Sequence, residues 1–325
     1  MNQSRSHFLL TTACGAVAAM ILISMVSTSP VTAAPEYSEW SAPINLGPVV
    51  NSGFNDLAPA LSKDGLSLYF QSNRPIGSAG GLDLWVSQRT DVDAPWGPPI
   101  NLGSAINTPF TEGGPAFSRD GHWMFFNSDR PQGGVGGTDI WVSWRAHTHD
   151  DFGWQPPVNL GPGVNSPSGD SVGSYFENKE GDTPLLFFSS NRPLTGSAPG
   201  GPYVSPQVGE GAFGPPTLVT ELDSPVDDMR PMIRFDGREI LLASGRPGSA
   251  GGRDLWVSTR DTVFDLWSAP LNLGSLVNSV ANELTPFISS DGRHLFFASD
   301  RIVPEQVGVV DLYVTKRAKP GGSEK

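Results

Sequence analysis

Cysteine and long apolar segments are both scarce in this sequence. The chain of 325 residues has one cysteine, Cys14, which lies in an apolar run near the N-terminus. A single thiol cannot form an internal disulfide, and it excludes a metal site built from several cysteines. No comparable apolar run follows residue 26, so we expect no membrane span once the N-terminal run is removed.

Positive charge is also scarce, because 21 Lys and Arg face 33 Asp and Glu, a net charge of −12. Nucleic-acid binding needs clustered basic residues, so this balance argues against a nucleic-acid partner. Gly and Pro are abundant instead, with 38 and 30 residues, which excludes a helical bundle. A hydrophobic content of 38% excludes a disordered chain. The composition therefore predicts a turn-dense all-β protein.

The N-terminal 33 residues have the pattern of a targeting segment. Arg5 precedes an uncharged apolar run from Phe8 to Val26, and Val31-Thr32-Ala33 places small residues at a cleavage site. This order is typical of a secretory signal peptide. The run has 19 residues, so an uncleaved N-terminal anchor is the alternative. Both interpretations predict an extracytoplasmic protein, secreted or in the periplasm or cell envelope.

The rest of the chain is a fivefold repeat. A Trp followed by Asn-Leu-Gly occurs at residues 40, 96, 154 and 267, and Phe213 begins a degenerate copy, at intervals of 54 to 59 residues. Each copy continues with an acid, an Asp-Gly turn, an apolar segment ending in Ser-x-Arg, a Gly-rich loop and a segment such as Asp-Leu-Trp-Val-Ser. Asp-Gly supplies the positive φ that a tight hairpin needs. In the third copy Glu180-Gly181 takes this place.

Four short strands per repeat predict the blades of a five-bladed β-propeller. The last copy lacks an outer strand, and residues 40–46 are expected to supply it and close the ring. The predicted organisation is a signal peptide at 1–33, a linker at 34–39, the propeller at 40–318 and a disordered tail at 319–325.

The repeat resembles the WD40-like propeller repeat called PD40, which is similar to the propeller half of TolB. The resemblance covers residues 40–317. It implies a propeller of the kind that serves as a binding platform in the bacterial envelope. Copy three departs from the pattern, because Gly201-Pro-Tyr-Val-Ser has no Asp and Gly173 replaces a Pro, and copy four lacks Asn-Leu-Gly.

One acid opens the inner strand of every predicted blade. These acids are Asp56, Glu112, Asp170, Asp228 and Glu283. One interpretation pairs them with the five equally regular Ser-x-Arg arginines, because unpaired like charges around the axis repel. The other makes them a funnel of carboxylates that holds a sugar or a cation, and in an enzyme these five would be the catalytic candidates.

Two places break the fivefold symmetry. Trp123 and Trp144 stand where other blades have polar residues, and neighbouring antiparallel strands are expected to bring the two rings together. Arg230 and Arg234 add positive charge next to the acid of blade four. We take these four residues as candidate ligand contacts, the Trp pair for a sugar and the arginines for an anion. The structural alternatives are packing for the Trp pair and neutralisation of the acid ring for the arginines.

No metal or cofactor is expected. Asp91 with Asp93, and Asp223 with Asp227 and Asp228, have enough oxygen atoms for Ca²⁺ but lack the spacing of an EF-hand loop. The chain contains no Gly-x-Ser-x-Gly, His-Glu-x-x-His or P-loop motif.

The expected function is that of an exported, non-catalytic binding module for a glycan or an envelope protein. The first alternative is a carbohydrate-active enzyme, a hydrolase or lyase, that uses carboxylates at the channel mouth. The second alternative is a scaffold for protein–protein interaction. Pairing of the acids separates the first two, because acids that are all held by arginines leave no general acid or base among them.

Overall fold

A computed structural model describes residues 37–178, 183–193 and 200–319. The predicted signal peptide, most of the linker, the Glu180-Gly181 turn and the tail from residue 320 lie outside these residues. The described residues form strands, turns and bends without a helix, so none of their elements is an apolar helix of membrane-spanning length.

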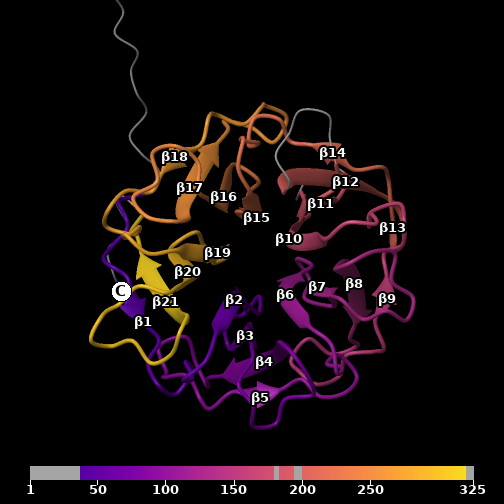
Figure 1. The fold of residues 1–325 in the computed structure, drawn as a ribbon, viewed down its shortest axis with the longest axis horizontal. Helices are drawn as coiled ribbons and strands as arrows, with labels where there is room; N and C mark the ends of the chain where they lie inside the picture. Colours follow the sequence, from indigo (N-terminus) through magenta and orange to yellow (C-terminus); the bar gives the residue numbers. More distant parts are fainter. Residues whose placement is uncertain (1–36, 179–182, 194–199, 320–325) are drawn as a thin grey trace, which may run out of the picture. The chain divides into compact units, whose positions relative to one another are not determined.

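Five antiparallel sheets are arranged in a ring, as Figure 1 shows. This confirms the predicted five-bladed β-propeller. The first blade consists of β2 (Asp56–Leu61), β3 (Ser67–Ser72), β4 (Asp83–Gln88) and β5 (Ile100–Asn101). The second consists of β6 (Glu112–Phe117), β7 (Trp123–Ser128), β8 (Asp139–Trp144) and β9 (Val158–Asn159).

The third blade consists of β10 (Asp170–Phe176), β11 (Leu185–Ser190), β12 (Gly201–Gly209), β13 (Ala212–Phe213) and β14 (Thr217–Leu218). The fourth consists of β15 (Asp228–Ile233), β16 (Glu239–Ser244), β17 (Asp254–Thr259) and β18 (Leu271–Asn272). The fifth consists of β19 (Glu283–Ile288), β20 (His294–Ser299), β21 (Asp311–Lys316) and β1 (Ile44–Asn45).

The N-terminal strand closes the ring as predicted. Ile44 lies opposite Val314 and Asn45 opposite Tyr313, so β1 becomes the outer strand of the fifth blade. The strand itself is only two residues long, although Trp40 before it is already buried. This pairing covers the outer edge of β21, which would otherwise be open to other chains.

The hydrophobic core lies between the blades. Each of five clusters combines side chains from two neighbouring sheets, and one of them joins Phe296 of the fifth blade to Phe70 of the first. The middle strands are rich in Phe and Leu because both of their faces are covered, and β16 is buried along its whole length.

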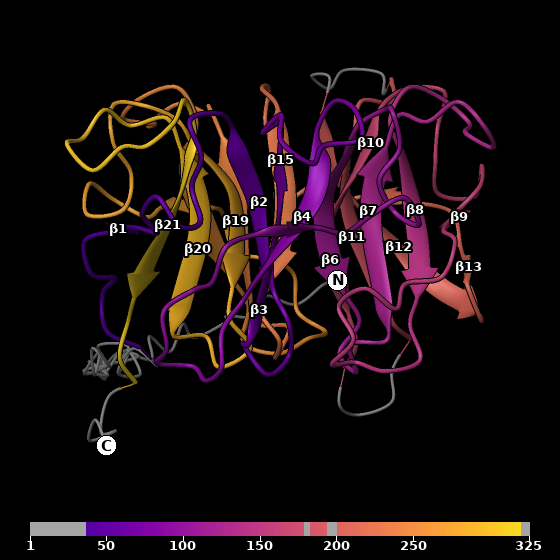
Figure 2. The ribbon, with the colours of Figure 1, turned by 90° about the horizontal axis from the view of Figure 1, so that it is seen from below.

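Positive backbone φ angles occur where the repeat needs them. The Gly of each Asp-Gly turn has φ between 71° and 82°, which confirms the predicted hairpins in four blades. Four inner strands also contain a β-bulge, and the third residue of each of these strands has positive φ: Ala58, Gly114, Arg230 and Thr285. Figure 2 shows the inner strands running from the upper to the lower face of the ring.

The third blade departs from four strands. β12 extends to Gly209, and the Glu210-Gly211 turn returns the chain as β13 before β14 takes the usual outer position. Phe213 takes the place of the repeat Trp, because the Gly214 amide donates to the Pro206 carbonyl as the Gly97 amide after Trp96 donates to Gln88. Equivalent contacts span nine residues from Ser205 to Gly214 and ten from Ser87 to Gly97, so the degenerate sequence reflects substitution of the motif and not an insertion.

Replacement of Trp40 by Ala is expected to lower the free energy of unfolding by about 3–5 kcal/mol, because a buried aromatic ring is removed. Trp144→Ala is the matched control. Its side chain is 39% exposed, so the loss should stay below about 1 kcal/mol. Denaturant unfolding of both variants measures the difference, and equal losses would contradict the assigned ring closure.

Candidate functional site

All five acids that open the inner strands are bound by the Ser-x-Arg arginines. The N···O distances lie between 2.6 and 3.1 Å, and each acid side chain is fully buried. The pairs are Asp56–Arg74, Glu112–Arg130, Asp170–Arg192, Asp228–Arg246 and Glu283–Arg301. The acids and arginines therefore form repeated ion pairs, which is the first of the two interpretations given for them above.

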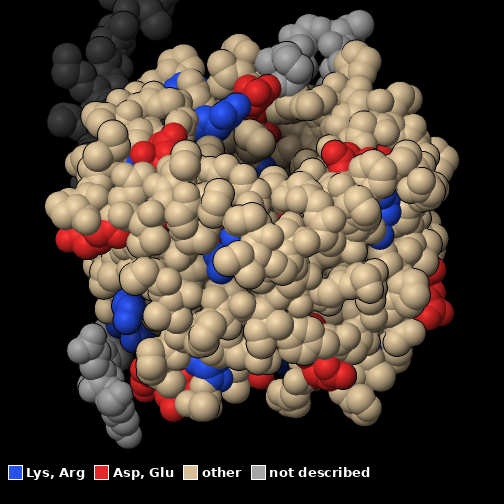
Figure 3. Space-filling model, turned by 60° about the horizontal axis from the view of Figure 1, so that its bottom comes forward, with Lys and Arg blue, Asp and Glu red and all other residues tan. Residues whose placement is uncertain are grey.

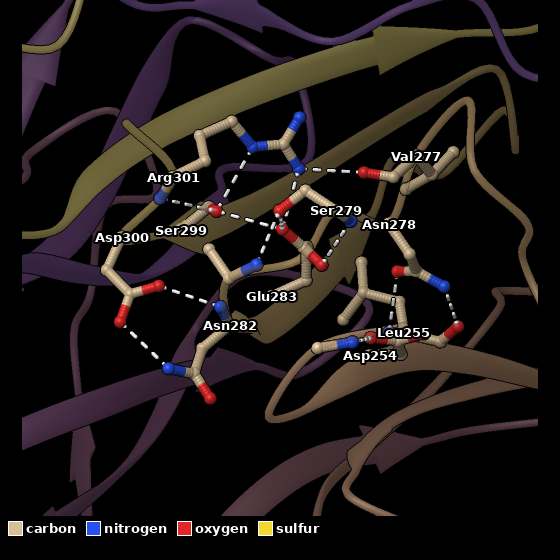
Figure 4. Close-up of polar contacts among 12 residues, drawn as sticks. Asp254, Leu255, Val277, Asn278, Ser279, Asn282, Glu283, Ser299, Asp300 and Arg301 are labelled. Carbon is tan, nitrogen blue, oxygen red and sulfur yellow. Dashed lines mark hydrogen bonds and ion pairs between the residues drawn. The ribbon is translucent and has the colours of Figure 1, made fainter. Parts of the chain in front are cut away.

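Further hydrogen bonds saturate most of these carboxylates, as Figure 4 shows for Glu283. Its Oε2 accepts the Ser279 amide at 2.8 Å, and its Oε1 accepts the hydroxyls of Ser279 and Ser299. Arg301 also donates to the Val277 carbonyl, so one arginine ties the loop to two strands. The fourth blade differs, because Asp228 Oδ2 is buried and accepts no hydrogen bond from the residues that the structure describes.

The pairing decides the chemistry of these acids. A carboxylate that is fully buried against a guanidinium cannot exchange protons with a substrate. The five acids therefore hold the inner strands in place, and none of them lines the central cavity described below.

The other recurring polar residues are also architectural. In Asp-Leu-Trp segments the Asp accepts an amide of the preceding Gly-rich loop, as Asp254 accepts the Ala250 amide at 2.8 Å. The Asn of Asn-Leu-Gly donates to the same carboxylate, as Asn272 does at 2.7 Å. A second Asn, Asn278, then binds both backbone groups of Leu255.

A further recurring contact was missed in the sequence. An arginine lies over the ring of each repeat Trp, with 4.2–4.4 Å between the guanidinium carbon and the ring centroid. The pairs are Arg89–Trp96, Arg145–Trp154, Arg260–Trp267 and Arg317–Trp40. The available signal was an Arg six residues after the Asp of each Asp-Leu-Trp segment. The contact explains why the Trp recurs.

A cavity of about 1050 Å³ lies at the centre of the ring on the side of the Asp-Gly turns. Every blade contributes to its wall, for example through Leu61, Ala116, Ser174, Met232 and Phe287. The other face, which points toward the viewer in Figure 1, is also hollowed at its centre. Acidic and basic side chains lie at the rim of this second hollow (Figure 3).

Four carboxylates line the cavity, those of Asp64, Asp93, Glu177 and Asp291. Glu177 differs from the other three, because it is half-buried while they are exposed. Its Oε2 accepts the Arg119 amide at 2.6 Å, and its Oε1 accepts no hydrogen bond from the described residues. The sequence analysis missed Glu177, which occupies no recurring position of the repeat.

Two titratable groups in the cavity wall, Asp291 and Tyr175, have shifted pKa values. Interaction with His294, together with hydrogen bonds from Ser289 and the Arg293 amide, holds the pKa of Asp291 well below its usual range. Burial, together with the nearby charges of Glu177 and Asp120, raises the pKa of the Tyr175 phenol well above its usual range. Asp291 is therefore ionised at neutral pH, and Tyr175 is neutral.

Trp123 and Trp144 lie directly opposite each other on β7 and β8, as the strand argument predicts. Their environments differ, because Trp123 packs against the core of the third blade while Trp144 stacks on His122 at 6.2 Å. Trp123 and Tyr175 also line a separate small cavity of about 140 Å³.

Arg230 and Arg234 have different surroundings. Arg234 forms ion pairs with Asp236 at 2.6 Å and Glu239 at 2.7 Å, so its charge is compensated within the fold. Arg230 is 5% exposed and its Nε has no hydrogen-bond partner. Only Arg230 retains the chemistry of a candidate anion contact.

The acidic clusters do not assemble a metal site in the described part of the chain, where no group of three or more suitable side chains could hold an ion. Asp228 is paired with Arg246, and Asp227 contacts Arg253 at 3.3 Å.

No protein-family model and no curated protein matches this chain. A thermostable family-43 glycoside hydrolase superposes with a TM-score of 0.56 at 13% identity, covering 86% of this chain and 97% of the other. The arabinanase Arb43A of Bacillus subtilis gives 0.54 at 14%, covering 84% and 97%. A putative TolB from Agrobacterium tumefaciens gives 0.46 at 17%, covering 82% and 79%.

These comparisons correct the expected function. The similar structures are mostly glycoside hydrolases of families 43 and 62, which contradicts the expectation of a non-catalytic binding module for a glycan or envelope protein. The same structures contradict the sequence-based leaning against an enzyme, a question that the sequence left open. At these identities the likeness itself establishes the five-bladed fold, and it does not identify the repeat as PD40.

Asp56→Asn is expected to lower the free energy of unfolding by about 3–5 kcal/mol, because it leaves the Arg74 guanidinium buried without its counter-charge. Asp93→Asn, at an exposed acid, should change it by less than about 0.5 kcal/mol. A double variant with Arg74→Met should lose less than the two single losses combined. Unchanged stability of Asp56→Asn would contradict the assigned role of the pair.

Proposed function

We propose that this protein is a carbohydrate-active enzyme, a hydrolase or lyase, whose substrate binds in the central cavity on the side of the Asp-Gly turns. The observation that carries the proposal is this cavity of about 1050 Å³, walled by all five blades of a propeller whose similar solved structures are glycoside hydrolases. The volume suits several sugar residues, since pockets for small ligands measure about 300–1000 Å³.

The wall of the cavity has the composition that sugars need. The aromatic rings of Trp96, Phe117 and Phe235 supply apolar surface, with Arg89 over one face of Trp96 and Arg119 over one face of Phe235. Lys63 and Arg293 supply hydrogen-bond donors. A sugar ring presents CH groups on its face and hydroxyls at its edge, so both kinds of contact contribute to binding.

Glu177 is our candidate for the general acid. Cleavage of a glycosidic bond uses one protonated and one ionised carboxyl group. Glu177 is half-buried in the cavity wall, with Oε2 held by the Arg119 amide and Oε1 without a hydrogen bond from the described residues, so Oε1 is the oxygen assigned to exchange a proton with the substrate. Asp291, whose pKa is lowered, supplies the ionised group. The five buried acids have no part in this scheme.

The remaining sequence-based assignments agree with this proposal. A glycan substrate outside the cytoplasm is consistent with the predicted signal peptide over 1–33. We also retain the PD40-type repeat as a proposal about the origin of the blades, supported by the recurring Asp-Gly, Ser-x-Arg and Asp-Leu-Trp segments. This proposal about the repeat does not include a function as a binding platform.

The test is incubation of the purified chain with soluble cell-wall polysaccharides, with arabinan and arabinoxylan included because the similar structures are arabinanases and arabinofuranosidases. New fragments detected by mass spectrometry are the expected result. Glu177→Gln should then lower kcat at least about 100-fold, the scale of general acid catalysis, with the melting temperature unchanged.

Glu305→Gln is the matched control, because Glu305 is an exposed glutamate outside the cavity, and it should keep wild-type turnover. Asp291→Asn should also lose turnover. Absence of fragments from every polysaccharide would refute the proposal. Fragments that persist in Glu177→Gln would refute the assignment of the acid while leaving the activity in place.

A further inference from the structure

The centre of the ring contains a positively charged side chain, that of Arg230, which forms no ion pair with the described residues. The third residue of each inner strand occupies an equivalent place, and in three blades it is small or aliphatic: Ala58, Gly114 and Val172. In the fifth blade it is Thr285, and in the fourth it is Arg230. A long charged side chain therefore stands where the repeat otherwise places a short one.

The guanidinium of Arg230 makes no hydrogen bond or ion pair with the described residues, and its Nε is fully buried. The nearby acid of its own strand, Asp228, is paired through Oδ1 with Arg246 at 2.6 Å. Burial lowers the pKa of Arg230 to about 10, and no acidic side chain opposes this effect. A buried charge without a partner is costly, so its presence calls for a ligand.

Two consecutive glycines in the second blade make room for Arg230 and for Gln71. A Cβ on Gly114 would lie 3.0 Å from Arg230 Nη1 and 2.5 Å from Asn127 Nδ2. A Cβ on Gly113 would lie 2.0 Å from Gln71 Oε1. Arg230 thus reaches across from the fourth blade to the second. Gly114 leaves room for the Arg230 guanidinium, and Gly113 leaves room for the Gln71 amide.

The side-chain amides of Gln71 and Asn127 each use their oxygen to accept a backbone N–H, which leaves their NH₂ groups as donors. The Gln71 oxygen accepts the Gly114 amide at 2.9 Å, and the Asn127 oxygen accepts the Val172 amide at 2.6 Å. A backbone N–H can only donate, so these bonds fix the orientation of both side chains. Their NH₂ groups make no hydrogen bond with the described residues. Arg230 Nη1 and Asn127 Nδ2 therefore lie against the same glycine with no acceptor.

We propose that Gln71, Asn127 and Arg230 form an anion-binding site in the central channel and that its ligand is a carboxylate. Asn127 Nδ2 and Arg230 Nη1 lie against Gly114, and Gln71 binds the amide of the same glycine. A carboxylate has two oxygen atoms that match a guanidinium in a bidentate arrangement. The carboxylate can belong to a uronate residue of an acidic glycan or to a free small acid. The site is separate from the cavity of Glu177, which Arg230 does not line.

The test measures binding of galacturonate and acetate by titration calorimetry in a buffer without other small anions, with neutral galactose for comparison. The wild-type protein should bind both acids and not galactose. Arg230→Met should weaken galacturonate binding at least tenfold. Arg253→Met is the matched control and should keep wild-type affinity, because Arg253 is an exposed arginine paired with Asp227.

A second variant covers the case in which Arg230→Met does not fold. Asn127→Asp keeps the oxygen that accepts the Val172 amide and places a second oxygen beside Arg230. This built-in carboxylate should raise the melting temperature in the absence of ligand and abolish the response to galacturonate. Wild-type affinity in either folded variant, or equal binding of galactose, would overturn the proposal.

Oligogalacturonates distinguish the two sources of the carboxylate. Tighter binding of oligomers than of galacturonate assigns the site to an acidic glycan, and weaker binding assigns it to free small acids. The measurement needs no turnover and is repeated in Glu177→Gln. Binding at Arg230 without cleavage of any polysaccharide would refute the proposed enzyme and leave the anion site established.

Discussion

The ion pair between the first residue of each inner strand and the Ser-x-Arg arginine is the contact on which the ring depends. In every blade it joins the start of the inner strand to the end of the middle strand, and the same arginine holds the carbonyl of the preceding loop, as Arg74 holds Val50. Inner strands contribute few large side chains, so packing alone does not fix their position. A fully buried carboxylate that loses its arginine would have to become neutral or be exposed to water.

This use of the acids divides the protein into a regular frame and a few exceptions. The frame consists of contacts repeated in most or all blades, including the Trp–Arg stacks and the Asn–Asp bonds. Chemistry that acts on one ligand needs a group that is not repeated around the ring. Glu177 and Arg230 meet this condition, and both lie along the axis where the blades converge. The exceptions in the sequence therefore locate the candidate sites better than the motifs do.

The fold was predictable because its determinants are local and repeated. The number and order of the strands follow from the Asp-Gly turns and the Ser-x-Arg segment ends. The closure of the ring follows from the last copy, which lacks its own outer strand. None of these inferences needs knowledge of distant contacts. The extra pairing of Phe213 with Gln207 was not predictable, because it results from the greater length of β12 and not from the motif. Glu177 was missed for a related reason. Its half-burial against Arg119 results from the meeting of the second and third blades, which no repeat position records.

The pairing of the acids also clarifies what the similarity to glycoside hydrolases implies. Five carboxylates regularly placed around a propeller axis suggest a catalytic ring, yet here each is neutralised by a buried guanidinium. A shared five-bladed frame supplies a central cavity, and the groups that line it supply the chemistry. If this chain cleaves glycans, its acid and base have to come from the cavity wall beyond the paired acids. Arg230 does not line this cavity, so the anion proposed to bind it is a question separate from the charge of the substrate.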